Sequence, residues 1–202
     1  GLSLGIAVGV MVGLSFIELI PEAQKMGGLA VALAGFASGA GIMLVLESVL
    51  PHMHGSKPVN VKGKYDKSRL IAIGIALHNL PEGFAVGAGF AHAPEFGLMV
   101  AIAMGLHNIP EGLVVAIPMR ANGASRRKAF KAAFLSGLAE PVGAISAFLL
   151  LQSFVSAIPF ALAFAAGVMV YVTLDELIPY AKCNGHEQFT SMGIIAGVCA
   201  AM

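Results

Sequence analysis

The sequence predicts an all-α, polytopic membrane helix bundle. Of 202 residues, 57% are hydrophobic and 11% are charged, whereas a typical soluble domain is about 25% charged. The mean hydropathy is +0.85, and 12 Lys and Arg with 11 Asp and Glu are too few to cover the surface of a soluble core. The apolar residues also occur in runs long enough to cross a bilayer. These features exclude the disordered, fibrous and nucleic-acid-binding classes.

Seven apolar segments are expected to be membrane-spanning α-helices. An isolated segment in lipid must satisfy its own backbone hydrogen bonds, and the period-2 alternation typical of membrane β-barrels is absent. The segments are Gly1–Ile20, Gly27–Leu50, Leu70–Ala91, Phe96–Met119, Ala132–Phe154, Ala157–Tyr180 and Phe189–Met202. Residues 1–202 are treated as one transmembrane domain. Because the first segment begins at residue 1 and the last is short, we expect sequence to be missing at both ends.

The positive charges predict the orientation. All but one of the 12 Lys and Arg residues lie after the second, fourth or sixth segment, and Lys25 is the exception. The positive-inside rule therefore places these three loops, including residues 51–69, in the cytoplasm, with the chain in the inner (cytoplasmic) membrane of the cell. Cys183 and Cys199 have no motif spacing, so no disulfide framework is expected.

The first and last thirds of the sequence contain an internal repeat. Residues 9–21 (GVMVGLSFIELIP) match residues 167–179 (GVMVYVTLDELIP) at an offset of 158. The same offset pairs Gly35 with Gly193 and Gly39 with Gly197. Five crossings separate the copies, which makes them antiparallel, as in transporters whose sites lie near the bilayer midplane. Because a segment precedes the second copy, we expect one before the first copy, which gives eight spans in the intact protein.

A second repeat, the hexapeptide H-N-x-P-E-G, lies in the central helix pair at residues 78–83 and 107–112. His and Glu four residues apart share a helix face, so neighbouring helices offer two imidazoles and two carboxylates to one point. Each proline leaves the carbonyl four residues earlier without a donor and is expected to kink its helix. Both hexapeptides and Glu140 lie near the bilayer centre, where carboxylates without compensation are costly.

These residue types indicate a site for one or two metal ions. Imidazole, carboxylate and amide oxygen suit Zn²⁺, Fe²⁺, Mn²⁺ or Co²⁺, and Cd²⁺ is a similar ion. Mg²⁺ and Ca²⁺ prefer all-oxygen ligands, and the lack of thiolates argues against Cu(I). The alternative is that each histidine only forms a hydrogen bond across a helix interface. Two whole hexapeptides at one depth make that alternative the weaker interpretation.

The paired hexapeptides resemble the Zrt- and Irt-like (ZIP) family of divalent metal transporters, of bacterial or archaeal type, over essentially the whole chain. The resemblance implies that the seven segments correspond to the family's second to eighth helices, with a binuclear site between them. The first metal would be held by His78, Glu82, His107 and Glu111, with Met11 within reach. The second metal, transported or structural, would be held by Asn79, Asn108 and Glu140, with Glu82 and Glu111 bridging.

Other acidic and histidine residues are candidates for the two ends of the ion path. Glu18 lies at the outer end of the first segment, and Asp175 and Glu176 lie at the inner end of its repeat. We expect these carboxylates to collect the cation at one mouth and release it at the other. His52 and His54 begin the long cytoplasmic loop and are expected to bind metal weakly.

The resemblance implies a carrier, not an enzyme, that moves a Zn²⁺-like ion into the cytoplasm by alternating access. The third to fifth segments would carry the metal and the others would form a scaffold. A proton-coupled exporter stays open because composition does not decide direction. A membrane-bound di-metal enzyme is the other alternative, although the Glu-x-x-His order of such centres is absent. Small residues of the second segment indicate packing within the chain or a homodimer: Gly35, Ser38, Gly39 and Gly41.

Overall fold

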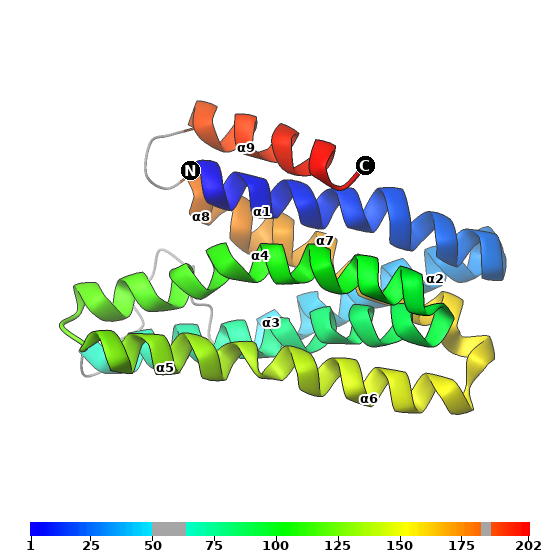
Figure 1. The fold of residues 1–202 in the computed structure, drawn as a ribbon, viewed down its shortest axis with the longest axis horizontal. Coiled ribbons are helices and arrows are strands. Elements are labelled where there is room, and N and C mark those ends of the chain that lie inside the picture. Colours follow the sequence, from blue (N-terminus) through cyan, green and yellow to red (C-terminus); the bar gives the residue numbers. More distant parts are fainter. Residues whose placement is uncertain (50–63, 183–186) are drawn as a thin grey trace.

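The computed structural model describes residues 1–49, 64–182 and 187–202, and these residues are helical apart from short turns (Figure 1). No β-strand occurs among them, as the sequence predicts. The elements in chain order are α1 (Leu2–Gly13), η1 (Leu14–Leu19), α2 (Ile20–Val49), α3 (Lys64–His92), α4 (Pro94–Ala121), α5 (Arg126–Gly137), α6 (Ala139–Ser153), η2 (Val155–Ala157), α7 (Ile158–Val172), η3 (Thr173–Leu177), α8 (Ile178–Lys182) and α9 (Glu187–Ala200).

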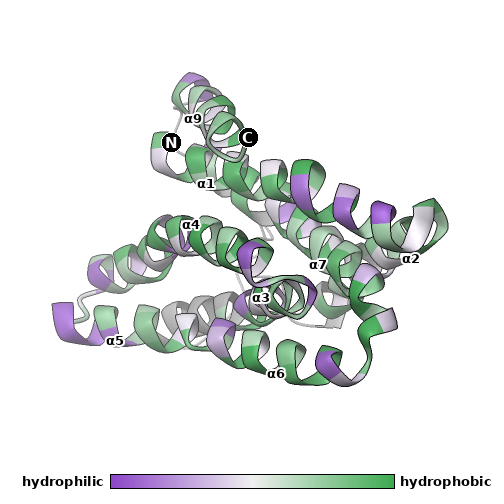
Figure 2. Ribbon diagram, turned by 45° about the vertical axis from the view of Figure 1, so that its right-hand side comes forward, coloured by the Kyte–Doolittle hydropathy of each residue, from purple (hydrophilic) through white to green (hydrophobic). Residues whose placement is uncertain are grey.

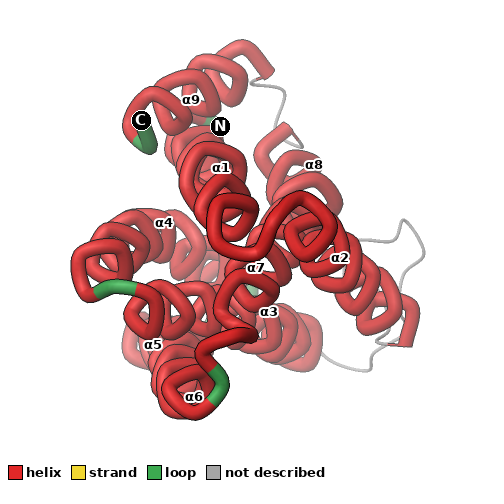
Figure 3. The backbone as a smooth tube through the Cα atoms, turned by 90° about the vertical axis from the view of Figure 1, so that its right-hand side faces the viewer, coloured by secondary structure: helices red, strands yellow, loops and turns green. Residues whose placement is uncertain are grey.

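The helices lie in two groups, seen end-on in Figure 3. Helices α3 to α6 form one group, which we call the motif group because it contains both hexapeptides. The frame group consists of α1, α2 and α7 to α9, in which α1 packs on α9 and α2 packs on α7. The groups meet where α1 contacts α4 and α3 contacts α7.

Hydrophobic residues predominate along the helices (Figure 2), and many large ones are exposed on the outside of the bundle. Leu106 and Ile109 of α4, for example, are 61% and 66% exposed. Such a surface is stable in lipid but not in water. Among the described residues, four helical stretches are long and apolar enough to cross a membrane: Leu2–Leu46, Pro94–Ala121, Arg126–Ser153 and Val155–Asp175. The prediction of an all-α membrane bundle is therefore confirmed.

The chain stays helical where the sequence analysis expects a loop between the first two segments. Helix continues from η1 into α2 through residues 21–26, and the chain turns back only at Gly28. Gly28 has φ of 79° and ψ of 168°, a conformation that residues with a side chain rarely adopt. The predicted loop boundary at Pro21 is wrong because the helix widens and accommodates the proline.

That widening is the π-helical turn η1, and an equivalent turn, η3, precedes Pro179. Pro21 and Pro179 have no N–H to donate to the carbonyl four residues earlier. In each case the residue before the proline donates its N–H to the carbonyl five residues back, as Ile20 does to Ser15. The two π turns therefore fall at corresponding positions of the 158-residue sequence repeat.

Two other boundaries differ from the predicted segments. The fifth segment is not one helix, because α5 ends at Gly137 and α6 begins at Ala139. Pro141 explains this break, since it cannot donate a hydrogen bond to the carbonyl of Gly137. Helix α3 begins at Lys64, six residues before the apolar segment, because hydropathy detects only the apolar part of a helix. Helices α3 and α4 continue through the prolines of their hexapeptides.

Backbones approach most closely within each group, at glycines. A Cβ added to Gly9 of α1 would lie 2.8 Å from the Cα of Gly197 in α9, and one added to Gly87 of α3 would lie 2.7 Å from the Cβ of Ala147 in α6. Among the described glycines, no approach of this kind joins the two groups. The groups meet through side chains instead, such as the rings of Phe84 and Phe164.

The small-residue face of α2 is used within the chain. Gly35 packs on the backbone carbonyl of Phe160 and Gly39 packs on that of Phe164, both in α7. Gly41 has no atom within 4 Å of an added Cβ. Packing between α2 and α7 thus accounts for Gly35 and Gly39 without a second copy of the chain.

Candidate metal centre

A short turn sets the two hexapeptides side by side. Only Ala93 separates α3 from α4. Its N–H donates to the carbonyl of Gly89 at 3.0 Å, and its carbonyl accepts from the N–H of Gly97 at 2.9 Å. His78 lies 15 residues before Ala93 and His107 lies 14 residues after it. The antiparallel hairpin therefore places the hexapeptides at the same level of the bundle.

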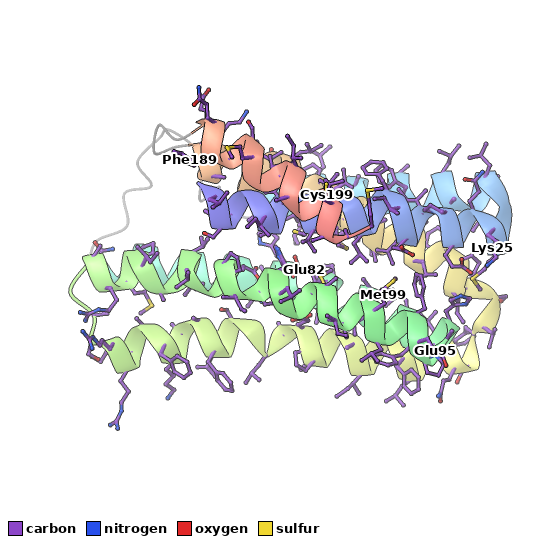
Figure 4. The ribbon with its side chains drawn as sticks, turned by 45° about the horizontal axis from the view of Figure 1, so that its top comes forward. Lys25, Glu82, Glu95, Met99, Phe189 and Cys199 are labelled. Atoms are coloured by element: carbon purple, nitrogen blue, oxygen red, sulfur yellow. The ribbon has the colours of Figure 1, made fainter. Side chains whose placement is uncertain are left out.

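Three side chains of the hexapeptides converge. One ligand atom each of Glu82, His107 and Glu111 lies within 4.8 Å of the other two. The Nε2 of His107 is 3.5 Å from the Oε1 of Glu82. The three residues are 2%, 1% and 6% exposed, and Glu82 lies near the middle of the bundle (Figure 4). The sequence prediction named all three, and together they could hold a metal ion.

Several polar atoms around this point are buried and make no hydrogen bond. They are the Oε2 of Glu82, both ring nitrogens of His107 and the Oδ1 of Asn108. A buried polar group without a partner costs about 1–3 kcal/mol, and a charged one costs more. A divalent cation would satisfy the oxygens and one nitrogen and would neutralise two carboxylates at once. The donor set therefore fits a cation better than it fits a set of helix-packing contacts.

The asparagines of the hexapeptides face the break between α5 and α6. The Nδ2 of Asn108 donates to the Oε2 of Glu140, in the first turn of α6. The Nδ2 of Asn79 donates to the carbonyl of Ser136 at 3.3 Å, at the end of α5. Pro141 causes the break, so the same local sequence that ends α5 sets Glu140 beside the second hexapeptide. This juxtaposition brings together two of the residues predicted for a second metal.

Two residues predicted for the first metal lie outside the convergent group. His78 is buried, at 9% exposed, but it is not among the three residues whose ligand atoms meet. Met11 of α1 is 1% exposed, and its Sδ lies 3.5 Å from the Oγ1 of Thr173. Met11 therefore lies in the core beside Thr173 of η3, while Glu82, His107 and Glu111 come from the hairpin.

An open groove of about 430 Å³ lies between α1, η1, α4 and the end of α9. Glu18 and Glu95 line it, as do Met99, Val10 and Leu106. Val10 and Leu106 are the sequence neighbours of Met11 and His107, so one end of the groove lies at the level of the metal centre along the helix axes. The sequence analysis named Glu18 as a candidate path residue and did not name Glu95 or Met99, which line the same groove. Two features of the sequence point to these residues. Glu95 is an acidic residue directly after the proline that begins α4, and Met99 lies two helical turns before His107.

The other predicted path residues are only partly described. Asp175 lies in η3 and is exposed. Glu176 belongs to the same turn, but its side chain lies outside the described part of the structure. His52 and His54 also lie outside the described residues.

Comparison with known proteins identifies the family. The family described as ZIP Zinc transporter matches residues 57–202, which include both hexapeptides and Glu140. This chain belongs to the ZIP family. Proteins named Zinc transporter ZupT are similar to it: that of Corynebacterium aurimucosum is 41% identical over 97% of this chain and 81% of the relative. Those of Corynebacterium glutamicum (41%) and Akkermansia muciniphila (40%) are aligned over 97% of this chain and 82% of the relative.

Membership of the ZIP family confirms the resemblance found in the paired hexapeptides. ZIP proteins are multi-pass membrane transporters, in agreement with the apolar helices of this chain. The chain is therefore a transporter and not an enzyme, so the alternative of a membrane-bound di-metal enzyme is set aside.

Proposed function

We propose that this ZIP chain carries Zn²⁺, or a similar divalent ion, into the cytoplasm through the buried centre of the motif group. The convergence of Glu82, His107 and Glu111 carries the proposal, because these ligands meet away from solvent and buried polar atoms of Glu82 and His107 make no hydrogen bond there. Nitrogen and carboxylate oxygen together suit Zn²⁺, Fe²⁺, Mn²⁺, Co²⁺ or Cd²⁺. The names of the relatives favour zinc among these ions.

The centre is proposed to be binuclear. Glu82, His107 and Glu111 would hold the first ion, with His78 and Met11 completing its ligands in a conformation other than this one. The contact between Asn108 and Glu140 supports a second position beside the first. The ligands of that second ion, which is transported or structural, would be Asn79, Asn108 and Glu140, with Glu82 and Glu111 bridging.

The seven segments are proposed to cross the membrane as an inverted repeat. Helix contacts related by the 158-residue offset support this arrangement. A Cβ on Gly9 would collide with the carbonyl oxygen of Ile194, and one on Gly167 would collide with that of Phe36. Gly167 is Gly9 plus 158, and Ile194 is Phe36 plus 158. Each copy of the first helix therefore packs on the second helix of the other copy, as a two-fold relation requires.

Alternating access is proposed to occur by movement of the motif group against the frame group. Close backbone packing at glycines, which resists sliding, occurs inside each group. Side chains form the boundary between the groups, and the core cluster that contains residues of both includes Met104 of α4 and Met169 of α7. Methionine has three rotatable bonds and repacks readily, which suits a sliding interface. Glu18 and Glu95 would receive the ion at one mouth, and Asp175 and Glu176 would release it at the other.

Uptake of Zn²⁺ into sealed vesicles tests the proposed function. Wild-type protein, reconstituted with a zinc indicator inside the vesicles, should give influx. Glu111→Gln and Glu82→Gln should reduce it at least tenfold, because each removes a charged ligand at the centre. Glu187→Gln is the matched control, since Glu187 is an exposed carboxylate in the first turn of α9.

Flux retained by both site variants would exclude the proposed path. The direction of zinc transport is tested by expressing the chain in cells that lack zinc uptake of their own. The proposal predicts that the wild-type chain increases their zinc content, whereas an exporter would lower the content of preloaded cells.

A further inference from the structure

We propose that the exposed face of α5 binds the headgroups of anionic phospholipids. This lipid-binding face consists of Arg126, Arg127, Phe130, Lys131 and Phe134. The packing of α5 decides which side is exposed. Ala129 on the opposite side is buried in a cluster with Val115 and Met119 of α4. The lipid-binding face therefore points away from the protein.

The cations of this face have no acidic partner among the residues whose side chains the structure describes. The side chains of Arg126, Arg127, Lys128 and Lys131 are exposed, and none forms an ion pair with a residue that the structure describes. By contrast, Lys25 on α2 lies 3.3 Å from Glu22. The first turn of a helix is also the positive end of its dipole, so three cations there repel the backbone as well as one another. Positive charge that no described acidic residue compensates favours an anionic ligand.

The apolar part of the face identifies the class of anion. Phe130 and Phe134 are 70% and 56% exposed, and their rings are stacked with centroids 6.1 Å apart. One of the candidate membrane spans begins at Arg126, so the cations lie where the apolar stretch starts. Phe130 and Phe134 follow at depths of about 6 and 12 Å along the helix. Figure 2 shows this change from a hydrophilic start of α5 to an apolar continuation.

A phospholipid matches both parts of this pattern. Its phosphate lies at the level of the cations, and its acyl chains lie beside the phenylalanine rings. Basic residues next to a membrane span attract anionic lipids, and each Lys or Arg near the membrane surface strengthens the binding about fivefold. A soluble anion of the same charge would satisfy the cations and leave both rings uncovered. The proposed occupant is therefore an anionic phospholipid such as phosphatidylglycerol. This inference does not depend on metal transport.

Lipid selectivity of the full chain tests the proposal. The protein is reconstituted in nanodiscs of phosphatidylcholine containing a minority of phosphatidylglycerol, then extracted, and its retained lipids are measured by mass spectrometry. Wild-type protein should retain phosphatidylglycerol about tenfold over its share of the mixture. The triple variant Arg126→Gln, Arg127→Gln and Lys131→Gln should lose this preference, whereas the triple Arg126→Lys, Arg127→Lys and Lys131→Arg, which keeps the charges, should preserve most of it.

Lys25→Gln is the control for a cation outside the proposed face, and it should behave as wild type. A glutamine triple variant that keeps the phosphatidylglycerol preference would overturn the proposal, as would an equal loss in Lys25→Gln. A salt titration of wild-type protein is a test that needs no variant. The preference should collapse between about 0.1 and about 1 M salt, where the Debye length falls from roughly 10 to 3 Å. A preference unchanged by salt contradicts binding through these charges.

Discussion

The close contact between α1 and α9 gives a prediction that can be calculated from the structure. A Cβ added at Gly9 would lie 2.8 Å from the Cα of Gly197 and closer still to the carbonyl oxygen of Ile194. Ordinary carbon–carbon contact is about 3.5–4.0 Å, so Gly9→Ala must separate the helices by roughly 0.7–1.2 Å. No rotamer relieves this collision, because both partners are backbone atoms.

The expected loss in the free energy of unfolding of Gly9→Ala is the difference between two opposing effects. Overpacking costs about 1–3 kcal/mol or more, and a contact between two backbones is at the upper end of that range. Alanine has a higher helix propensity than glycine, which stabilises the folded protein by up to about 1 kcal/mol. A net loss of about 2 kcal/mol corresponds to a melting temperature lower by roughly 4–8 °C for a chain of this size.

Thermal unfolding of purified protein in detergent measures this effect. Gly167→Ala should lower the melting temperature by a similar amount, because Gly167 meets the carbonyl of Phe36 in the corresponding contact. Gly41→Ala is the control, since no atom lies within 4 Å of its added Cβ, and it should be neutral or stabilising. A large loss in one of the paired variants with none in the other would refute the two-fold relation. A loss in Gly41→Ala equal to theirs would refute the packing calculation.

Three further predictions concern polar contacts. Asn108→Leu removes the amide that holds Glu140, and vesicle flux of Zn²⁺ should fall about 10- to 100-fold, while the melting temperature reports any loss of fold. Glu22→Gln weakens contacts to Lys25 (3.3 Å) and His92 (3.0 Å), and thermal unfolding should show a loss of about 1 kcal/mol or less because the group is partly exposed. Equilibrium dialysis should show weaker Zn²⁺ binding at acidic pH, because protons compete with the metal for imidazole and carboxylate.

Much of the fold follows from the sequence because the bilayer simplifies the problem. Apolar length located the helices, and the repeated hexapeptide identified Glu82, His107 and Glu111 because residues four apart share a helix face. Depth along its segment identified Glu140, which lies beside Asn108. These inferences depend only on apolar length, depth along a segment and helix periodicity.

The remaining features depend on how helices pack, which hydropathy does not report. The turn at Gly28 was missed because Pro21 was the stronger local signal and a π turn absorbed it. His78 shares a helix face with Glu82 but precedes it by one turn, about 6 Å along the axis of α3, so a shared face alone does not bring both side chains to one point. Glu95 was overlooked because its relation to Glu18 arises only when α4 packs near α1.

Equilibrium binding of Zn²⁺ to the purified protein tests the central claim most directly. If Glu82, His107 and Glu111 form the metal centre, Glu82→Gln, His107→Ala and Glu111→Gln should each weaken binding by about 100-fold or more, because loss of an outer-shell partner alone costs about 10- to 100-fold. His92→Gln and Glu187→Gln, which alter exposed or partly exposed groups outside the centre, should bind as wild type. Undiminished binding in all three site variants would contradict the assignment.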